Sequence, residues 1–228
     1  MMMVRTIANV DYELVIKLGE VLQHKVMAAD EVIVRSKAGT DLIGYNRGRK
    51  VRLSGRKATE KGYPVMLAGQ ISWCPIEETI NGKLVFDGAM WPPLDLGKLS
   101  SNVELTLKDG IVTSIEGGND ALKAKAWFEE LNDPNMYRLA HYSLGFNPGV
   151  TAITGRIVED ERVFGCIEFG VGSQGMSIMG KQWNAASHTD GIVLNPTILL
   201  DGKEFEVDGV YVDKDVQEIC KQLGVKGY

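Results

Sequence analysis

Three Asx-Gly pairs, each lying between segments rich in β-forming residues, constrain the fold more than any other feature. These pairs are Asn81-Gly82, Asp109-Gly110 and Asp201-Gly202. A type I′ turn needs positive φ at both central residues, which these residue types tolerate, and it joins two antiparallel strands directly. We therefore predict three hairpins, made by segments 65–76 with 83–90, 102–107 with 111–116, and 198–200 with 204–207. Three such turns indicate a mainly antiparallel sheet.

Helical patterns flank the predicted strands. Residues 9–29 carry one apolar stripe, and Asn9 or Asp11 can cap that helix. The stripe consists of Val15, Leu18, Val21, Leu22 and Val26. Further helices are predicted at 120–131, 135–144, 150–161 and 213–223, and a strand at 31–36. We therefore predict an α+β fold, a mainly antiparallel twisted sheet with flanking helices. Residues 1–38 form an N-terminal arm of helix and strand, and residues 39–228 form the main domain.

Composition narrows the class of protein. The 228 residues are 44% hydrophobic and carry a formal charge of −5. This balance fits a globular protein and argues against nucleic acid as the partner, since no strong basic excess is present. No apolar run reaches the roughly eighteen residues of a membrane span. The N-terminus has no apolar segment of signal-peptide length, so we expect a cytoplasmic protein without a membrane partner.

The cysteines limit the kinds of metal site. Cys74, Cys166 and Cys220 are odd in number and far apart in the sequence. They predict neither a disulfide framework nor a zinc knuckle, so a metal site in this chain would have to use histidine and carboxylate.

The segment His188-Thr189-Asp190 is the strongest candidate for such a site. On an extended strand the side chains of His188 and Asp190 lie on the same face. With a third ligand, and His141 is the nearest other histidine, they would form a site of two histidines and one carboxylate, which suits non-haem Fe(II). The alternative is that Asp190 only orients a structural histidine. We assign the remaining histidine, His24, to packing or to the surface.

Two other features have more than one interpretation. Six cations lie within residues 47–57, namely Arg47, Arg49, Lys50, Arg52, Arg56 and Lys57. They could bind an anionic substrate or a partner subunit, or they could belong to a solvated hairpin. Glu168 lies in an apolar segment that predicts a strand leading into a glycine-rich loop at Gly172. Its carboxylate either faces solvent or is held in a site.

Seven short segments, taken in order, resemble a known superfamily. They are Gly39-Thr40-Asp41-Leu42, Leu67-Ala68-Gly69-Gln70, Gly82 to Gly88, Gly145-Phe146-Asn147-Pro148-Gly149, Glu159-Asp160-Glu161-Arg162, Gly165 to Gly172, and His188-Thr189-Asp190. The series resembles the C-terminal catalytic half of the aminopeptidase T (leucyl aminopeptidase-like) metallopeptidases. That superfamily includes the 2,5-dihydroxypyridine 5,6-dioxygenases. Its members usually carry a further N-terminal α/β domain, which we expect to be absent here.

The resemblance distinguishes two branches by their metal ligands. Peptidase members hold two metal ions with two glutamates, histidines and an aspartate, assisted by a tyrosine. In this chain His188 and Asp190 match that pattern directly. The other positions differ: Gln70 and His141 stand in place of the two glutamates, Glu168 in place of a histidine, and Gly175 in place of the tyrosine. The dioxygenase pattern fits better, and it implies a single Fe(II) held by His141, His188 and Asp190.

This resemblance implies ring opening of a hydroxylated aromatic or N-heterocycle by O₂, in a metal-binding catalytic domain at residues 39–228. Glu168 or Gln70 would orient the ring nitrogen or hydroxyl, and a buried Glu168 could accept the substrate proton. Tyr142 and Ser187, next to the ligands in sequence, would be supporting hydrogen-bonding groups.

Two alternatives stay open at this stage. A divergent metallohydrolase would use Zn²⁺, Mn²⁺ or Co²⁺ at the same three residues to cleave an amide or lactam. A non-catalytic remnant would use the scaffold for assembly. In the favoured case the partners are a small-molecule substrate and O₂, and the chain forms a homodimer or a higher homo-oligomer.

Overall fold

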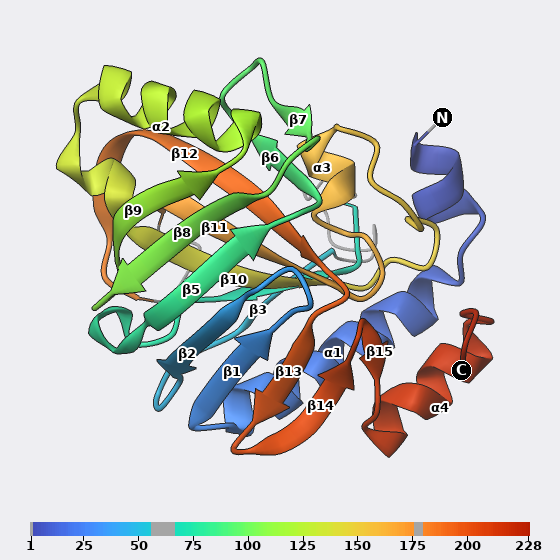
Figure 1. Ribbon diagram of the computed structural model, residues 1–228. Coiled ribbons are helices and arrows are strands. Elements are labelled where there is room, and N and C mark those ends of the chain that lie inside the picture. Colours follow the sequence, from blue (N-terminus) through green and yellow to red (C-terminus); the bar gives the residue numbers. More distant parts are fainter. Residues whose placement is uncertain (1, 56–66, 176–179) are drawn as a thin grey trace.

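A computed structural model describes residues 2–55, 67–175 and 180–228. Two antiparallel sheets form the body of the molecule (Figure 1). Within the described residues the first sheet has eight strands in the order β15-β14-β13-β1-β2-β5-β8-β9, and the second has seven in the order β3-β4-β10-β11-β12-β6-β7. The predicted α+β class with a mainly antiparallel sheet is confirmed.

The strands of the first sheet come from both ends and the middle of the chain. They are β1 (Glu31–Arg35), β2 (Asp41–Tyr45), β5 (Asn81–Phe86), β8 (Val103–Lys108), β9 (Ile111–Gly117), β13 (Thr197–Leu200), β14 (Lys203–Val207) and β15 (Val210–Tyr211). Strand β1 lies between β2 and β13. The segment predicted as an N-terminal arm therefore shares a sheet with the C-terminal part of the chain, and the boundary at residue 38 stays a prediction.

The second sheet carries the candidate site. Its strands are β3 (Arg52–Ser54), β4 (Gln70–Trp73), β6 (Ala89–Trp91), β7 (Gly97–Lys98), β10 (Leu139–Gly145), β11 (Cys166–Gln174) and β12 (Trp183–Leu194). The long strands β10, β11 and β12 are hydrogen-bonded neighbours at its centre. Backbone groups there are paired on both sides, so the centre of this sheet is the part best suited to hold side chains in fixed positions.

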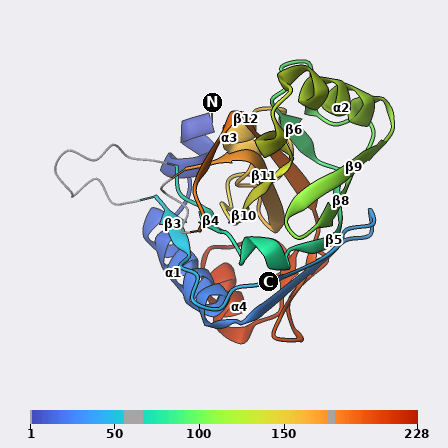
Figure 2. The ribbon, with the colours of Figure 1, turned by 90° about the vertical axis from the view of Figure 1, so that its left-hand side faces the viewer.

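Helices cover the outer parts of the sheets. The longer ones are α1 (Tyr12–Ala28), α2 (Asn119–Leu131) and α4 (Lys214–Gln222), and the short ones are the π-helix η1 (Val4–Ala8), the 3-10 turns η2 (Glu77–Thr79) and η3 (Pro134–Tyr137), and α3 (Ile157–Asp160). Helix α1 begins where Asp11 accepts a hydrogen bond from the backbone N–H of Leu14, as an N-cap does. Figures 1 and 2 show α1 and α4 together, next to β13–β15. No helix among the described residues is long and apolar enough to cross a membrane.

The main core lies between the sheets. Phe86 of β5 meets Phe169 of β11 with ring centroids 6.5 Å apart, and Tyr142 of β10 packs edge-on against Phe169 at 4.6 Å. All three rings are fully buried. Burying an aromatic or large aliphatic side chain contributes roughly 1.5–3 kcal/mol, so this face of β10 and β11 is fixed by packing. The opposite face of the same strands is therefore available for polar groups.

Two of the three predicted hairpins are confirmed. Asp109-Gly110 joins β8 to β9, and Asp201-Gly202 joins β13 to β14, with positive φ at all four residues. The prediction for Asn81-Gly82 is wrong, because both residues lie inside β5, between β2 and β8. A Cβ on Gly82 would collide with the carbonyl oxygen of Asp41. This glycine permits close approach of two strands and does not form a turn.

The helix predictions are likewise confirmed at some positions and wrong at others. Helices at 9–29, 120–131 and 213–223 are confirmed as α1, α2 and α4. The helix at 135–144 is wrong, because after η3 the chain forms the central strand β10, whose apolar residues Leu139, Ala140 and Leu144 also fit a helical period. Most of the helix predicted at 150–161 is absent too, leaving α3. There the Asp160 carboxylate accepts hydrogen bonds from Thr154 and Gly155 and holds an irregular loop.

Glu206 of β14 is a fully buried carboxyl group whose two oxygens have no hydrogen-bond partner among the described residues. Burial raises its pKa well above the ordinary value of 4.5. The folded protein therefore holds Glu206 in its neutral form at pH values where the unfolded chain would ionise it.

We expect Glu206→Gln to flatten the pH dependence of stability. Because the pKa is higher in the folded state, the folded protein binds the extra proton, and wild-type stability falls as pH rises from the unfolded value towards the folded value. Glutamine does not titrate, so this contribution disappears. Urea unfolding of both proteins between about pH 5 and about pH 8.5 checks this, since the variant should gain relative stability as pH rises. Parallel pH profiles would contradict it.

Candidate metal centre

The strand register brings the predicted ligands together. His141 of β10 lies opposite Gly170 of β11, and Gly170 lies opposite Asp190 of β12. Residues directly opposite each other on antiparallel strands point to the same face. His188 is two residues before Asp190 on β12 and shares that face. The three predicted ligands therefore project from the face of the second sheet that is turned away from the main core.

Gly170 makes this convergence possible. The rings of His141 and His188 lie nearly parallel above it, with centroids 5.1 Å apart and an interplanar angle of 15°. A Cβ atom on Gly170 would lie 2.7 Å from Cε1 of His188 and closer still to the His141 ring. The backbone of Gly170 is not in the left-handed region, so only the space above it requires glycine. A side chain on the middle strand would separate the two imidazoles.

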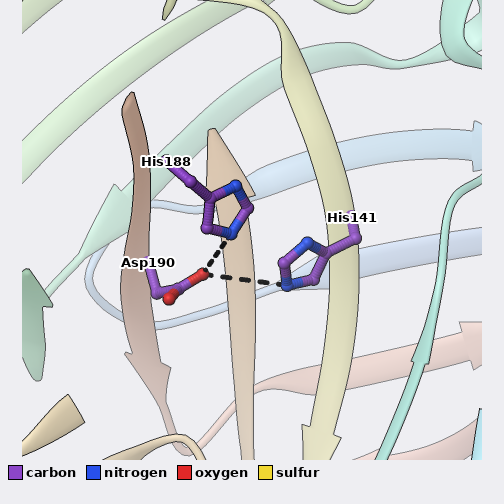
Figure 3. Close-up of side chains that lie close together, drawn as sticks. All are labelled: His141, His188 and Asp190. Carbon is purple, nitrogen blue, oxygen red and sulfur yellow. Dashed lines mark hydrogen bonds and ion pairs between the residues drawn. The ribbon is translucent and has the colours of Figure 1, made fainter. Parts of the chain in front are cut away.

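The donor atoms face one another (Figure 3). Nε2 of His188 lies 2.9 Å from Oδ1 of Asp190, and Nε2 of His141 lies 3.8 Å from the same oxygen. One ligand atom from each of the three residues falls within 4.8 Å of the others. Nδ1 of His188 lies 2.7 Å from the backbone oxygen of Ser173, to which it can donate. That hydrogen bond leaves Nε2 of His188 as the atom with a free electron pair beside Asp190.

This donor set fits a divalent transition metal. When each histidine is neutral and Nε2 carries no proton, two nitrogen lone pairs and a carboxylate oxygen point at one region. Such a group of acceptors needs a cation between them, either a proton or a metal ion. Two imidazoles and one carboxylate form a site with open coordination positions, which suits non-haem Fe(II) and also Zn²⁺.

Glu168 lies beside the triad, two residues before Gly170 on β11. It is fully buried, and its carboxyl oxygens lie 3.0 and 3.2 Å from Nε2 of His141. Gln70 of β4 places its amide nitrogen 3.4 Å from the same carboxyl group. Of the two interpretations of Glu168, the structure favours a carboxyl group held in the site over a carboxylate that faces solvent. It also brings Gln70 next to Glu168.

The buried charges shift one another's pKa. Burial raises the pKa of Glu168 well above its ordinary value, and the carboxylates of Asp190 and Glu161 raise it further. Burial lowers the pKa of His141, and the positive charge of Arg52 adds to this while Asp190 and Glu161 oppose it. For His188, burial is outweighed by the hydrogen bond and charge of Asp190, so its pKa is raised. For Asp190, burial is outweighed by the hydrogen bond and charge of His188, so its pKa is lowered.

A pocket of about 490 Å³ opens above these residues. The triad lines one part, the β3–β4 edge contributes Arg52 and Gln70, and the segment around α3 contributes Glu161. The volume suits a small ring compound, since ligand pockets usually enclose about 300–1,000 Å³. Polar groups line it from several sides, so it suits a polar ligand.

Tyr142 and Ser187 lie elsewhere. Tyr142 points into the main core, where its ring contacts Trp73 and Phe169. Ser187 directs its hydroxyl to the backbone oxygen of His188 at 3.5 Å and lies on the other face of β12 from the ligands. A residue directly adjacent to a ligand along a strand points to the opposite face of the sheet. The structure therefore does not bring either side chain to the triad. A supporting role for them stays a prediction.

Sequence reasoning did not single out three site residues. Gly170 carries no chemical group, and its role appears only when β10 and β12 are known to flank it. Arg52 was one of six cations in the basic segment at residues 47–57. Two of those cations, Arg56 and Lys57, lie outside the described residues. Glu161 was seen only as part of a resembling segment. The pairing of strands from distant parts of the chain was the missing information.

Comparison with known proteins identifies a family and similar folds. The NicX family model, described as 2,5-dihydroxypyridine 5,6-dioxygenase, matches residues 2–213. A solved structure of 2,5-dihydroxypyridine dioxygenase from Pseudomonas putida KT2440 is similar at a TM-score of 0.80 and 22% identity, covering 94% of this chain and 63% of that one. Wild-type AmpT from Thermus thermophilus is similar at a TM-score of 0.63 and 12% identity, covering 90% of this chain and 56% of that one. No curated protein matches the chain.

Both solved structures are under 25% identical to the chain, so they support its fold alone. The chain spans about 63% of the length of the dioxygenase chain and about 56% of the AmpT chain. The suspected resemblance to this superfamily is confirmed, and the family model that matches is the one for the dioxygenases.

We expect Gly170→Ala to weaken metal binding at least about 10-fold, since displacing the imidazoles should cost as much as loss of an outer-shell partner. Anaerobic calorimetric titration of the apoprotein with Fe(II), or with Zn²⁺ as a redox-inert probe, measures this. Gly191→Ala is the matched control. A Cβ there would press on the Phe86 ring on the core side, so it should lower the melting temperature without disturbing the triad. Wild-type metal affinity in Gly170→Ala would overturn this account of the site.

Proposed function

Because the chain belongs to the NicX family of 2,5-dihydroxypyridine 5,6-dioxygenases, we propose that it is a mononuclear non-haem Fe(II) dioxygenase that opens the ring of a hydroxylated aromatic or N-heterocycle. His141, His188 and Asp190 would hold the iron. The observation that supports this most is the convergence of two imidazole nitrogens and one carboxylate oxygen within 4.8 Å. A dihydroxypyridine-like compound is the proposed substrate.

The proposed reaction balances without an added reductant. One carbon–carbon bond of the ring breaks, both atoms of O₂ enter the product, and the substrate supplies the four electrons that O₂ accepts. An Fe(II) ion held by His141, His188 and Asp190 would supply the redox chemistry that couples ring oxidation to O₂ reduction. The protein's own residues bind and orient the ring in the pocket and limit the access of water to it.

We assign positioning roles to Glu168 and Gln70. Glu168 contacts Nε2 of His141, and its raised pKa favours a neutral carboxyl group that can donate a hydrogen bond as well as accept one. Gln70 lies next to it and lines the pocket, so its amide can orient a ring nitrogen or hydroxyl. Gln70 also bears on the hydrolase alternative, since a neutral amide is a poor bridge between two divalent cations.

The wider setting follows the same proposal. Substrate and O₂ are the small-molecule partners, and a homodimer or larger homo-oligomer in the cytoplasm is the proposed assembly and location. Sedimentation of the purified protein tests the oligomeric state directly.

His141→Ala should abolish activity by removing one of the three ligands. Protein purified without oxygen or chelator and loaded with Fe(II) is expected to take up O₂ with 2,5-dihydroxypyridine. In the variant, bound iron and O₂ uptake should both fall by more than about 100-fold, beyond the usual cost of losing an outer-shell partner. His24→Ala on α1 is the control and should behave as wild type. Unchanged iron binding in His141→Ala would contradict the proposal. Amine release without O₂ uptake would favour a Zn²⁺, Mn²⁺ or Co²⁺ hydrolase instead.

Glu168→Gln tests the positioning role. Glutamine has nearly the same shape and can still donate to a neighbour, but it lacks the charge and the proton of the acid. We expect iron affinity to change by less than about 10-fold and kcat to fall about 10- to 100-fold, the range seen when supporting groups of metal sites are altered. Glu168→Ala should lower both. A Gln variant with wild-type kcat on the same substrate would show that Glu168 fills space only.

A further inference from the structure

The basic segment at residues 47–57 is the sequence feature that the proposed function leaves unused. Its described cations lie in different surroundings. Arg47 pairs with Asp30 at 2.6 Å on the surface, and Arg49 pairs with Glu77 on η2. Arg52 instead lines the pocket that contains the metal triad. The structure therefore separates one member of the segment from those committed to structural ion pairs.

The strand register explains why Arg52 reaches the pocket. Arg52 of β3 lies opposite Ser72 of β4, Ser72 opposite Ser143 of β10, and Ser143 opposite Glu168 of β11. This row runs alongside the row of His141, Gly170 and Asp190, on the same face of the sheet. The two serines are small and are hydrogen-bonded to each other at 2.8 Å. They leave room above them between the arginine and the metal ligands.

The guanidinium of Arg52 has little to neutralise it. Its recorded side-chain hydrogen bond is to the hydroxyl of Ser54, at 3.3 Å, and no ion pair within the described part of the chain includes it. The second arginine of the pocket differs. Arg162 is buried, pairs with Glu161, and donates to the backbone oxygens of Leu67 and Val158. Its charge is paired with Glu161, and its Nε and Nη1 groups donate to protein oxygens.

The charge balance of the loaded pocket favours an anion. A divalent ion beside the carboxylate of Asp190 leaves one positive charge, or none where Glu168 is ionised as well. The ion pair of Arg162 with Glu161 adds no charge, and Arg52 adds one positive charge in either case. A guanidinium offers parallel N–H donors that match a carboxylate or an ionised hydroxyl. An anionic oxygen on a ring held at the metal would meet this cation on the β3–β4 side of the pocket.

We propose that Arg52 determines specificity by binding an anionic oxygen of the substrate, remote from the ring atoms that face the metal. The substrate class is then a hydroxylated N-heterocycle that carries a negative charge, either on a ring carboxylate or on an ionised ring hydroxyl. This assignment rests on the proposed function, because it uses the same pocket, and it adds which substrates that pocket selects.

The test compares ligands of equal shape and different charge. Binding of a hydroxypyridine carboxylate, of the corresponding carboxamide and of 2,5-dihydroxypyridine is measured by calorimetry on Zn²⁺-loaded protein, and O₂ uptake is measured on Fe(II)-loaded protein. Arg52→Gln should weaken binding of the anionic ligand about 10- to 100-fold, the usual worth of a hydrogen bond to a charged group. Binding of the carboxamide should stay within about 2-fold. Arg52→Lys should restore part of the loss, and Arg47→Gln, outside the pocket, should change neither.

The outcomes separate the two anionic oxygens and the two proposals. A loss confined to the carboxylate identifies that group, whereas a loss for 2,5-dihydroxypyridine alone identifies the ionised hydroxyl. Equal loss for the carboxylate and the carboxamide, or no loss for any ligand, overturns the role of Arg52 while wild-type O₂ uptake upholds the proposed function. Charge-selective loss in a protein that takes up no O₂ with any ligand upholds Arg52 and overturns the dioxygenase.

Discussion

The site depends on a steric constraint at the centre of the second sheet. Strands β10 and β12 carry ligands that must reach each other across β11, and neighbouring strands in a sheet lie about 4.8 Å apart. His141 and Asp190 can meet because the residue between them, Gly170, has no side chain. Everything else in the site is arranged around that gap: the stacked imidazoles above it, and Glu168 one pleat away on the same strand.

The two faces of the central strands have different roles, since one face packs into the core and the other carries the polar groups of the site. On one face, Tyr142 and Phe169 pack into the core between the sheets. On the other, His141 and Glu168 carry groups whose burial would be costly without partners. Packing on the first face fixes the backbone, and the fixed backbone then holds polar groups in contact that would otherwise separate. The alternation of side chains along a strand is sufficient to keep these two environments within a few ångströms of each other.

Local sequence signals predicted the fold where the local signal was also the structural cause. Asp109-Gly110 forms a hairpin because both residues tolerate positive φ, and α1 follows its apolar stripe. Local signals failed where residues distant in the sequence determine the local structure. The segment of β10 matches a helical period, yet its neighbours β4 and β11 make it a strand. The same distinction holds in the site, since His188 and Asp190 form a local pattern whereas the role of Gly170 depends on pairing across three strands.

The placement of all three ligands on hydrogen-bonded central strands has a consequence for how the protein acquires its metal. Such donors are already assembled when the chain has folded, so loading is an encounter between an ion and a finished site, and the bound ion stabilises the folded state because the unfolded chain lacks that site. A finished site with two imidazoles and one carboxylate also has few means to reject competing ions. Intrinsic affinities for such donors rise from Fe²⁺ towards Cu²⁺, and Zn²⁺ also binds more tightly than Fe²⁺. The identity of the bound ion would then reflect which metals are accessible where the protein matures, more than any preference built into its fold.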